Sequence, residues 1–126
     1  DGCETWPSKA EDIQRLIRTE SSMVRWMYGR AFNHDTSMTT TLRKLNITPV
    51  SDLMRRNRLR WYGHVERRPN TSWLKQVQML QIPGVVRKGR PAKTWKETIR
   101  HDLKTTGLKK EMTQDRPAWR RAIQNC

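Results

Sequence analysis

Residues 55–62 interleave arginines with aromatic residues, a combination that suits the chemistry of phosphate groups and nucleobases. A guanidinium group presents a planar fork of N–H donors that matches phosphate oxygens, and an aromatic ring stacks on a base or a sugar. The candidate contacts in this segment and just after it are Arg55, Arg56, Arg58, Arg60, Tyr62, Arg67 and Arg68. The competing interpretation keeps Trp61 in a core and leaves the arginines solvated.

A second basic cluster follows at residues 87–96. The run Lys88-Gly89-Arg90-Pro91 resembles the Arg-Gly-Arg-Pro core of minor-groove AT-hooks. In such an arm, glycine lets the backbone approach the floor of the groove and the basic side chains enter its negative potential. The candidate contacts here are Arg87, Lys88, Arg90, Lys93 and Lys96. A flexible basic loop is the competing interpretation of the same residues.

Residue types that could carry catalysis or hold a metal ion form no recognisable site. His34, His64 and His101 stand too far apart in the sequence to suggest a metal-binding pair. No pair of aspartates resembles the two-metal site of a polymerase or nuclease, and no phosphate-binding glycine loop of Walker type is present. We therefore expect no catalytic residue, no metal and no cofactor, and we expect that this chain alone is not an enzyme.

The net charge is concentrated in the later part of the chain. In all, 26 lysines and arginines outnumber 12 aspartates and glutamates, which gives a net charge of +14. Residues 1–36 hold five bases and six acids, a sum of −1, whereas residues 37–126 hold 21 bases and six acids, a sum of +15. Because like charges on a compact surface repel unless phosphates or counterions screen them, the basic part predicts a nucleic-acid partner, whether RNA, DNA or a hybrid.

Composition also bears on the compartment. Only 34% of the residues are hydrophobic, and no apolar run approaches the roughly 20 residues that cross a bilayer. The chain starts with polar and acidic residues, so we expect no secretory signal and no membrane partner. The two cysteines, Cys3 and Cys126, cannot form a disulfide framework. These features favour an intracellular protein, nuclear or cytoplasmic.

The elements that must position the basic residues are predicted to be helices. Ser8 and Glu11 have the spacing of a capping box, which opens a long amphipathic helix that ends near Gly29. Its apolar face comprises Ile13, Leu16, Ile17, Met23, Val24, Met27 and Tyr28. Because Glu20 falls inside this apolar arc, we expect it to pair with a base from another helix.

Two further helices are predicted, a short one over residues 37–45 and a longer one over residues 48–68, opened by Thr48 and Pro49. The longer helix carries an apolar stripe of Val50, Leu53, Met54, Trp61 and Val65. One flank of the stripe holds Arg56, Arg60 and Arg67, and the other holds Arg55 and Arg58. This arrangement buries Trp61, leaves the arginines accessible and leaves Tyr62 unassigned.

The remaining signals complete a mainly α fold. Thr94 and Glu97 form a second capping box, and the helix ends at Gly107 with Leu108 placed to touch Leu103. A last helix starts near residues 115–117 and buries Trp119, Ala122 and Ile123. Residues 77–91 fit either a short β-hairpin or an extended arm. We expect a small helical domain of four or five helices.

Several short motifs follow one another along nearly the whole chain. They are Gly2-Cys3-Glu4-Thr5-Trp6, Arg58-Leu59-Arg60-Trp61-Tyr62-Gly63-His64-Val65 with Arg67-Arg68-Pro69, Gly89-Arg90-Pro91 followed by Trp95, Asp102-Leu103 with Gly107-Leu108, and Asp115-Arg116 with Trp119-Arg120. In order and spacing this series resembles the C-terminal region of non-LTR retrotransposon reverse transcriptases of the RTE-like clade.

The resemblance implies a nucleic-acid-binding segment of an RNA-directed DNA polymerase that grips template-primer or target DNA by phosphate contacts. Residues 1–36 would belong to the thumb, and residues 37–126 would form the basic C-terminal region. The polymerase aspartates would belong to an upstream palm domain, which is therefore a second expected partner.

Two other hypotheses remain open. The chain could be a stand-alone or domesticated DNA-binding protein that reads AT-rich DNA through the arm at residues 88–91, and competition between AT-rich and GC-rich duplexes would detect this. It could instead be a basic protein-interaction domain with an acidic partner, which would co-purify with a protein and without nucleic acid.

Overall fold

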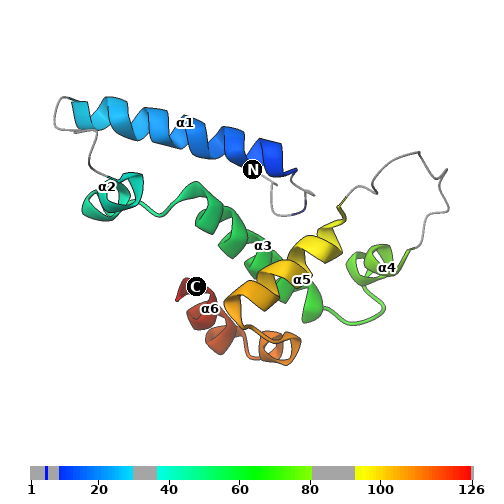
Figure 1. The fold of residues 1–126 in the computed structure, drawn as a ribbon. Coiled ribbons are helices and arrows are strands. Elements are labelled where there is room, and N and C mark those ends of the chain that lie inside the picture. Colours follow the sequence, from blue (N-terminus) through cyan, green and yellow to red (C-terminus); the bar gives the residue numbers. More distant parts are fainter. Residues whose placement is uncertain (1–4, 6–8, 30–36, 81–92, 126) are drawn as a thin grey trace, which may run out of the picture. The chain divides into compact units, whose positions relative to one another are not determined.

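The structure of the protein is a computed structural model that describes residues 5, 9–29, 37–80 and 93–125. In chain order the elements are α1 (Ala10–Tyr28), α2 (Met38–Lys44), α3 (Val50–Glu66), α4 (Trp73–Met79), α5 (Trp95–Thr106), the short 3₁₀ helix η3 (Lys110–Gln114) and α6 (Arg116–Gln124) (Figure 1). The predicted mainly α fold is confirmed, with six α-helices over the described ranges instead of four or five. None of these helices is long and apolar enough to span a membrane.

The helices belong to two compact units. The N-terminal unit, Ser8–Arg55, contains α1, α2 and the first turns of α3. The C-terminal unit comprises Asp1–Pro7 and Arg56–Cys126 and contains the rest of α3 and all later helices. The net charge divides near residue 36, whereas the packing divides inside α3, so the boundaries in charge and in packing differ.

In the N-terminal unit, α1 forms where its periodicity predicts. Its N-cap is Lys9, without a side-chain capping bond, and Ser8 of the predicted capping box lies outside the described residues. Gly29 ends the helix with a φ of 57°, a conformation that glycine adopts readily. Of the predicted apolar face only Val24 is fully buried, while Met23 and Met27 are exposed. Within this unit the seven-residue α2 is too short to cover a helix of 19 residues.

Glu20 has a different partner from the one expected. Its carboxylate accepts a hydrogen bond of 2.9 Å from the backbone N–H of Val50, the first residue of α3. The first amides of a helix have no partner inside the helix, and its N-terminus carries partial positive charge. The positive group that the structure places at Glu20 is thus a helix end, and the expected pairing with a basic side chain stays a prediction.

The predicted starts of α2 and α3 are nearly right. Ser37 caps α2, because its hydroxyl accepts a hydrogen bond from the N–H of Thr40. The Pro49 carbonyl accepts the first helical bond of α3, from the Leu53 N–H over 3.0 Å. Pro49 therefore stands at the cap position itself, one residue before the first helical position predicted for it.

The C-terminal unit packs around one apolar core. Its buried members are Leu59, Tyr62, Ile99, Trp119 and Ile123, and Trp95, Leu103 and Leu108 pack against them. On α3 the buried side follows a spacing of three residues, Leu59, Tyr62 and Val65. The prediction that Trp61 faces the core is wrong, since Trp61 is half-buried and Leu59, which the predicted stripe omitted, is fully buried.

A close approach between α3 and α6 fixes this orientation of α3. The Trp119 indole N–H donates to the Leu59 carbonyl over 3.1 Å. A Cβ atom at Gly63 would overlap the indole Nε1 and lie 2.6 Å from its Cδ1. Only a glycine at this position lets Trp119 lie against the backbone of α3.

The later helix boundaries are confirmed. Thr94 and Glu97 form the complete capping box of α5, and Gly107 ends the helix in the left-handed conformation with a φ of 70°. The Leu108 N–H reaches the Leu103 carbonyl over 3.1 Å, as in a Schellman motif. At α6, the Asp115 carboxylate accepts a hydrogen bond from the Ala118 N–H.

The segment between α3 and α5 differs in part from the expectation. Residues 73–79 form α4, so the first residues of the predicted hairpin or arm, 77–79, are helical. Leu74, Lys75, Gln76, Gln78 and Met79 have high helix propensity, which favours α4, while Ser72 stands at the N-cap position without a side-chain capping bond. The rest of the predicted arm, including the AT-hook-like run, lies outside the described residues.

Candidate phosphate-binding pocket

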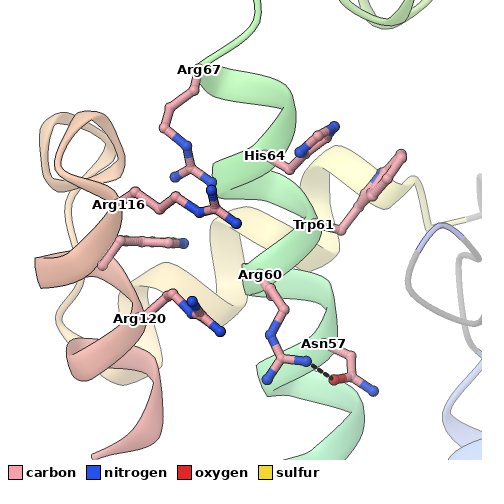
Figure 2. Close-up of a pocket in the computed structure, with 8 residues that line it drawn as sticks. Asn57, Arg60, Trp61, His64, Arg67, Arg116 and Arg120 are labelled. Carbon is pink, nitrogen blue, oxygen red and sulfur yellow. Dashed lines mark hydrogen bonds between the residues drawn. The ribbon is translucent and has the colours of Figure 1, made fainter.

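The C-terminal unit contains a pocket of about 290 Å³ between α3 and α6 (Figure 2). Its lining residues are Asn57, Arg60, Trp61, His64, Arg67, Arg116, Trp119 and Arg120. Four of these eight residues are arginines, and none is an aspartate or a glutamate. We call this feature the arginine pocket.

Helical spacing brings the arginines together. Arg60 and His64 are four residues apart on α3, and Arg67 follows directly after its last residue, so the three are neighbours along the helix surface. On α6, Arg116 and Arg120 are four residues apart and share a face in the same way. The docking of Trp119 against Gly63 then brings the two basic faces to one pocket.

The arginines differ in how firmly they are held. One end of the Arg67 guanidinium donates to the Thr113 carbonyl over 2.8 Å, so this half-buried side chain is anchored. Arg60 donates to the Asn57 side-chain oxygen over 3.3 Å and is otherwise exposed. Arg116 and Arg120 are exposed. In Figure 2 the guanidinium groups of Arg67 and Arg116 point toward one another.

The pKa values of two side chains in the pocket are lowered, because positive charges lie close together and the lining holds no acidic side chain. Burial and the nearby Arg116 lower the pKa of the Arg67 guanidinium, which nevertheless stays charged near neutral pH. Burial, followed by the charges of Arg68, Arg67 and Arg116, lowers the pKa of His64 from its ordinary value of 6.5. A negatively charged ligand would relieve this mutual repulsion.

Two rings lie at the edge of the pocket. The rings of Trp61 and His64 are stacked, with centroids 5.3 Å apart and planes inclined by 20°. The Arg68 Nε–H group donates to His64 Nε2 over 3.4 Å, which fits a neutral imidazole with its proton on Nδ1. Figure 2 shows the two rings on one side of α3 and the side chains of Arg67 and Arg116 on the other.

Arg58 does not lie with the other arginines. Its guanidinium forms two hydrogen bonds with the Asp102 carboxylate, Nε to Oδ2 at 2.8 Å and Nη2 to Oδ1 at 3.2 Å. Both side chains are only 7% exposed. The expected phosphate contact of Arg58 is therefore corrected: a buried charge must be paired, and Arg58 joins α3 to α5 inside the core.

Tyr62 is also removed from the surface. It belongs to the buried core of the C-terminal unit, where its ring lies 6.4 Å from that of Trp119. Burial, with smaller effects of Glu66 and Glu111, raises the pKa of the Tyr62 hydroxyl to about 12. Of these two adjacent residues it is Trp61, and not Tyr62, that lines the arginine pocket.

The other predicted contacts are dispersed. Arg55 lies in the N-terminal unit and pairs with Asp52 over 2.7 Å, and Arg56 is half-buried outside the lining of the arginine pocket. Arg68 is exposed beside His64, and Lys93 and Lys96 are exposed near the start of α5. The candidates Arg87, Lys88 and Arg90 lie outside the described residues. Of the predicted residues, then, the arginine pocket holds Arg60 and Arg67.

A second pocket of about 500 Å³ lies in the same unit, and Lys96 is part of its lining. Two of the four cations in its lining have partners within it: Lys110 forms an ion pair with the Glu66 carboxylate at 3.2 Å, and Lys75 donates to the Glu66 carbonyl at 3.1 Å. Because Glu66 places a negative charge in its lining, this pocket suits a phosphate less well than the arginine pocket does.

Arg116 and Arg120 were not among the predicted contacts. The signal that could have found them is their four-residue spacing on either side of Trp119, which places two cations on one face of a helix whose tryptophan faces the core. Sequence reasoning favoured dense basic runs, whereas this site draws arginines from two distant segments.

Within the part of the chain that the structure describes, no group of three or more His, Cys, Asp or Glu side chains is placed to hold a metal ion. The lining of the arginine pocket offers cations, hydrogen-bonding groups and the rings of Trp61 and His64, while its third ring, that of Trp119, is buried. Such groups bind anions and planar groups. Comparison with protein-family models, with curated proteins and with solved structures found no match for this chain.

Proposed function

We propose that this chain is a nucleic-acid-binding segment that holds phosphates in the arginine pocket, as part of the C-terminal region of a non-LTR retrotransposon reverse transcriptase. The observation that carries the proposal is the convergence of four arginines from α3 and α6 on one pocket with no carboxylate in its lining. Phosphate oxygens supply the missing negative charge, and the guanidinium forks match their geometry.

The distribution of charge supports a polyanion rather than a single small anion. Residues 37–126 carry a formal charge of +15, far more than one bound phosphate would balance. A nucleic-acid backbone presents one negative charge at each phosphate, and binding to it gains free energy from released counterions. The contacts we assign are to the backbone, so they position the nucleic acid with little readout of its sequence.

The proposed origin in a non-LTR retrotransposon reverse transcriptase is supported by the resemblance of the sequence motifs to those of that family. Residues that carry these motifs include Arg58, Gly63 and Trp119, which join α3 to α5 and α6. The motifs therefore include the residues that hold the C-terminal unit together as well as those that line its pocket. In this proposal an upstream palm domain carries out the polymerase reaction, and this chain binds the phosphates of the nucleic acid.

The test is the salt dependence of binding. Replacing Arg60, Arg116 and Arg120 together with glutamine removes three exposed charges from the pocket. The matched control replaces Lys104, Lys109 and Arg121 with glutamine, three exposed cations of the same unit outside both pockets. Both variants have the same net charge, so a difference between them reports the position of the charges.

We expect the logarithm of the association constant to fall steeply with the logarithm of salt concentration for the unaltered chain. Each phosphate that the protein ceases to neutralise reduces this slope by about 0.9 for a duplex and about 0.7 for a single strand, so the pocket variant should have a slope smaller by about 2 to 3 units and the control variant should change much less. Equal reductions in the two variants would contradict the pocket as the site. A slope near zero for the unaltered chain, or exclusive binding to an acidic protein, would overturn the function.

A further inference from the structure

The stacked pair of Trp61 and His64 is not explained by packing or by phosphate binding. Trp61 is half-buried and is not a member of the apolar core, which uses its neighbours Leu59 and Tyr62. Its ring nevertheless lies in an ordered stack with His64 and lines the same pocket as the arginines. The pocket thus combines a large ring, held in place, with positive charge that no carboxylate of the lining balances. This combination suits a ligand that has both a planar group and a phosphate.

We infer that the arginine pocket takes single-stranded nucleic acid, with a base stacked on the Trp61–His64 pair and the adjoining phosphates on the arginines. This inference rests on the proposed function and narrows it to one class of nucleic acid. A strand that crosses α3 beside Arg60 passes from the arginine side of the helix to the side that carries the two rings (Figure 2).

The size of the pocket favours a single strand. Its volume of about 290 Å³ is just below the usual range of small-molecule pockets, which suits one nucleotide and not the body of a duplex. In a duplex both faces of each internal base are covered by its neighbours, so the base cannot stack on a side chain unless it is flipped out. A single strand can turn a base toward the ring and keep its phosphates on the arginines.

The order of the ring pair lowers the entropy that binding must remove. The stack with Trp61 on one side and the hydrogen bond from Arg68 on the other restrict the His64 ring before any ligand enters. Stacking of a base on an aromatic side chain requires no particular base, because every base has a π-face. The pocket should therefore show little sequence preference within single strands.

The experiment compares three probes with the full chain at one salt concentration: an oligothymidylate, a duplex of equal length, and an abasic strand of equal length. The variants are Trp61→Ala, the conservative Trp61→Phe, and Trp73→Ala as the matched control. Trp73 is 70% exposed on α4 and lines neither pocket. Circular dichroism and thermal unfolding establish that each variant remains folded.

We expect the oligothymidylate to bind more tightly than the duplex and the abasic strand. Trp61→Ala should weaken oligothymidylate binding about tenfold while changing abasic-strand binding less than about twofold, and Trp61→Phe should restore most of the affinity. Trp73→Ala should leave all three affinities unchanged.

Two results would overturn the inference: an equal loss of affinity for all three probes in Trp61→Ala, or no loss for any of them. If nucleic acid binds with a steep salt dependence in either case, the proposed function stands and only the single-strand assignment fails. If no probe binds at any salt concentration, both fail together.

Discussion

Whether an arginine side chain of α3 is buried or exposed depends on whether a carboxylate lies close enough to pair with it. Arg58 and Arg60 are two residues apart on α3, yet the first is buried against Asp102 and the second lies at the surface in the arginine pocket. A buried guanidinium that loses its partner is left with uncompensated charge in a medium that solvates it poorly. Arg58 therefore belongs to a structural ion pair, whereas Arg60 is accessible and is proposed to bind phosphate.

Asp102→Asn is therefore expected to destabilise the C-terminal unit by about 3 kcal/mol, because it leaves the Arg58 charge buried without its counter-charge. The matched control is Asp52→Asn, which removes the partner of Arg55 from a pair whose side chains are 25% and 34% exposed. That change should cost less than about 1 kcal/mol. Denaturant unfolding measures both values, and equal effects would contradict a structural role for the Arg58–Asp102 pair.

His64 should make binding depend on pH. Burial and the charges of Arg68, Arg67 and Arg116 lower its pKa in the free protein, so the imidazole is neutral near pH 7. A bound phosphate opposes these charges and raises the pKa, and binding then takes up a proton. Affinity should rise as the pH falls through the pKa of the bound state and should level off below the pKa of the free state.

The measurement is the affinity for a single-stranded oligonucleotide between about pH 8 and about pH 5. His64→Gln should flatten the pH dependence while retaining binding, because the arginines remain. His101→Gln is the matched control, since His101 is exposed on α5 and does not line the pocket. A pH profile that His64→Gln leaves unchanged would assign the titration to another group.

At the scale of elements, the packing of α6 on α3 creates the arginine pocket. Trp119 is 1% exposed, bonds to the Leu59 carbonyl and fills the space over Gly63. The arginines of α6 lie beside those of α3 only because the contact between Trp119 and Gly63 is so close. Any group added at Gly63 must push α6 away and with it Arg116 and Arg120.

Gly63→Ala should consequently weaken both the fold and the binding. Inserting a methyl group into a packed contact typically costs about 1 to 3 kcal/mol, although alanine has the better helix propensity. Thermal unfolding and single-strand affinity should fall together. The control is Gly107→Asn at the end of α5, which retains a residue that tolerates positive φ at a site with no atom near its Cβ. It should change stability only slightly, and an intact affinity in Gly63→Ala would contradict the role of this contact.

Local sequence signals predicted the ends of α5 well, because these ends depend only on residues close together in the chain. The capping box of Thr94 and Glu97 and the glycine end at Gly107 depend on neighbours within a few residues, and both are present as predicted. The face of α3 was not predictable in this way. Its two adjacent aromatics suit either side of the helix, and the partner that selects Tyr62 for the core is Trp119, 57 positions later in the numbering.

At the scale of the whole molecule, charge and packing follow different boundaries. The sequence is near neutral over residues 1–36 and strongly basic afterwards, whereas the compact units divide inside α3. Two of the predicted basic contacts, Arg55 and Arg60, accordingly belong to different units although they lie on one helix. A surplus of positive charge thus predicts a polyanion partner without predicting which arginines contact it.

The sequence by itself determined the mainly α fold, most helix boundaries and the excess of positive charge, because these depend on composition and on residues close together in the chain. Only the tertiary structure decided that Arg58 is a core residue, that Trp61 and not Tyr62 is the accessible ring, and that Arg116 and Arg120 join Arg60 and Arg67. The physical reason is that these roles depend on contacts between segments more than 40 residues apart, which no local pattern encodes.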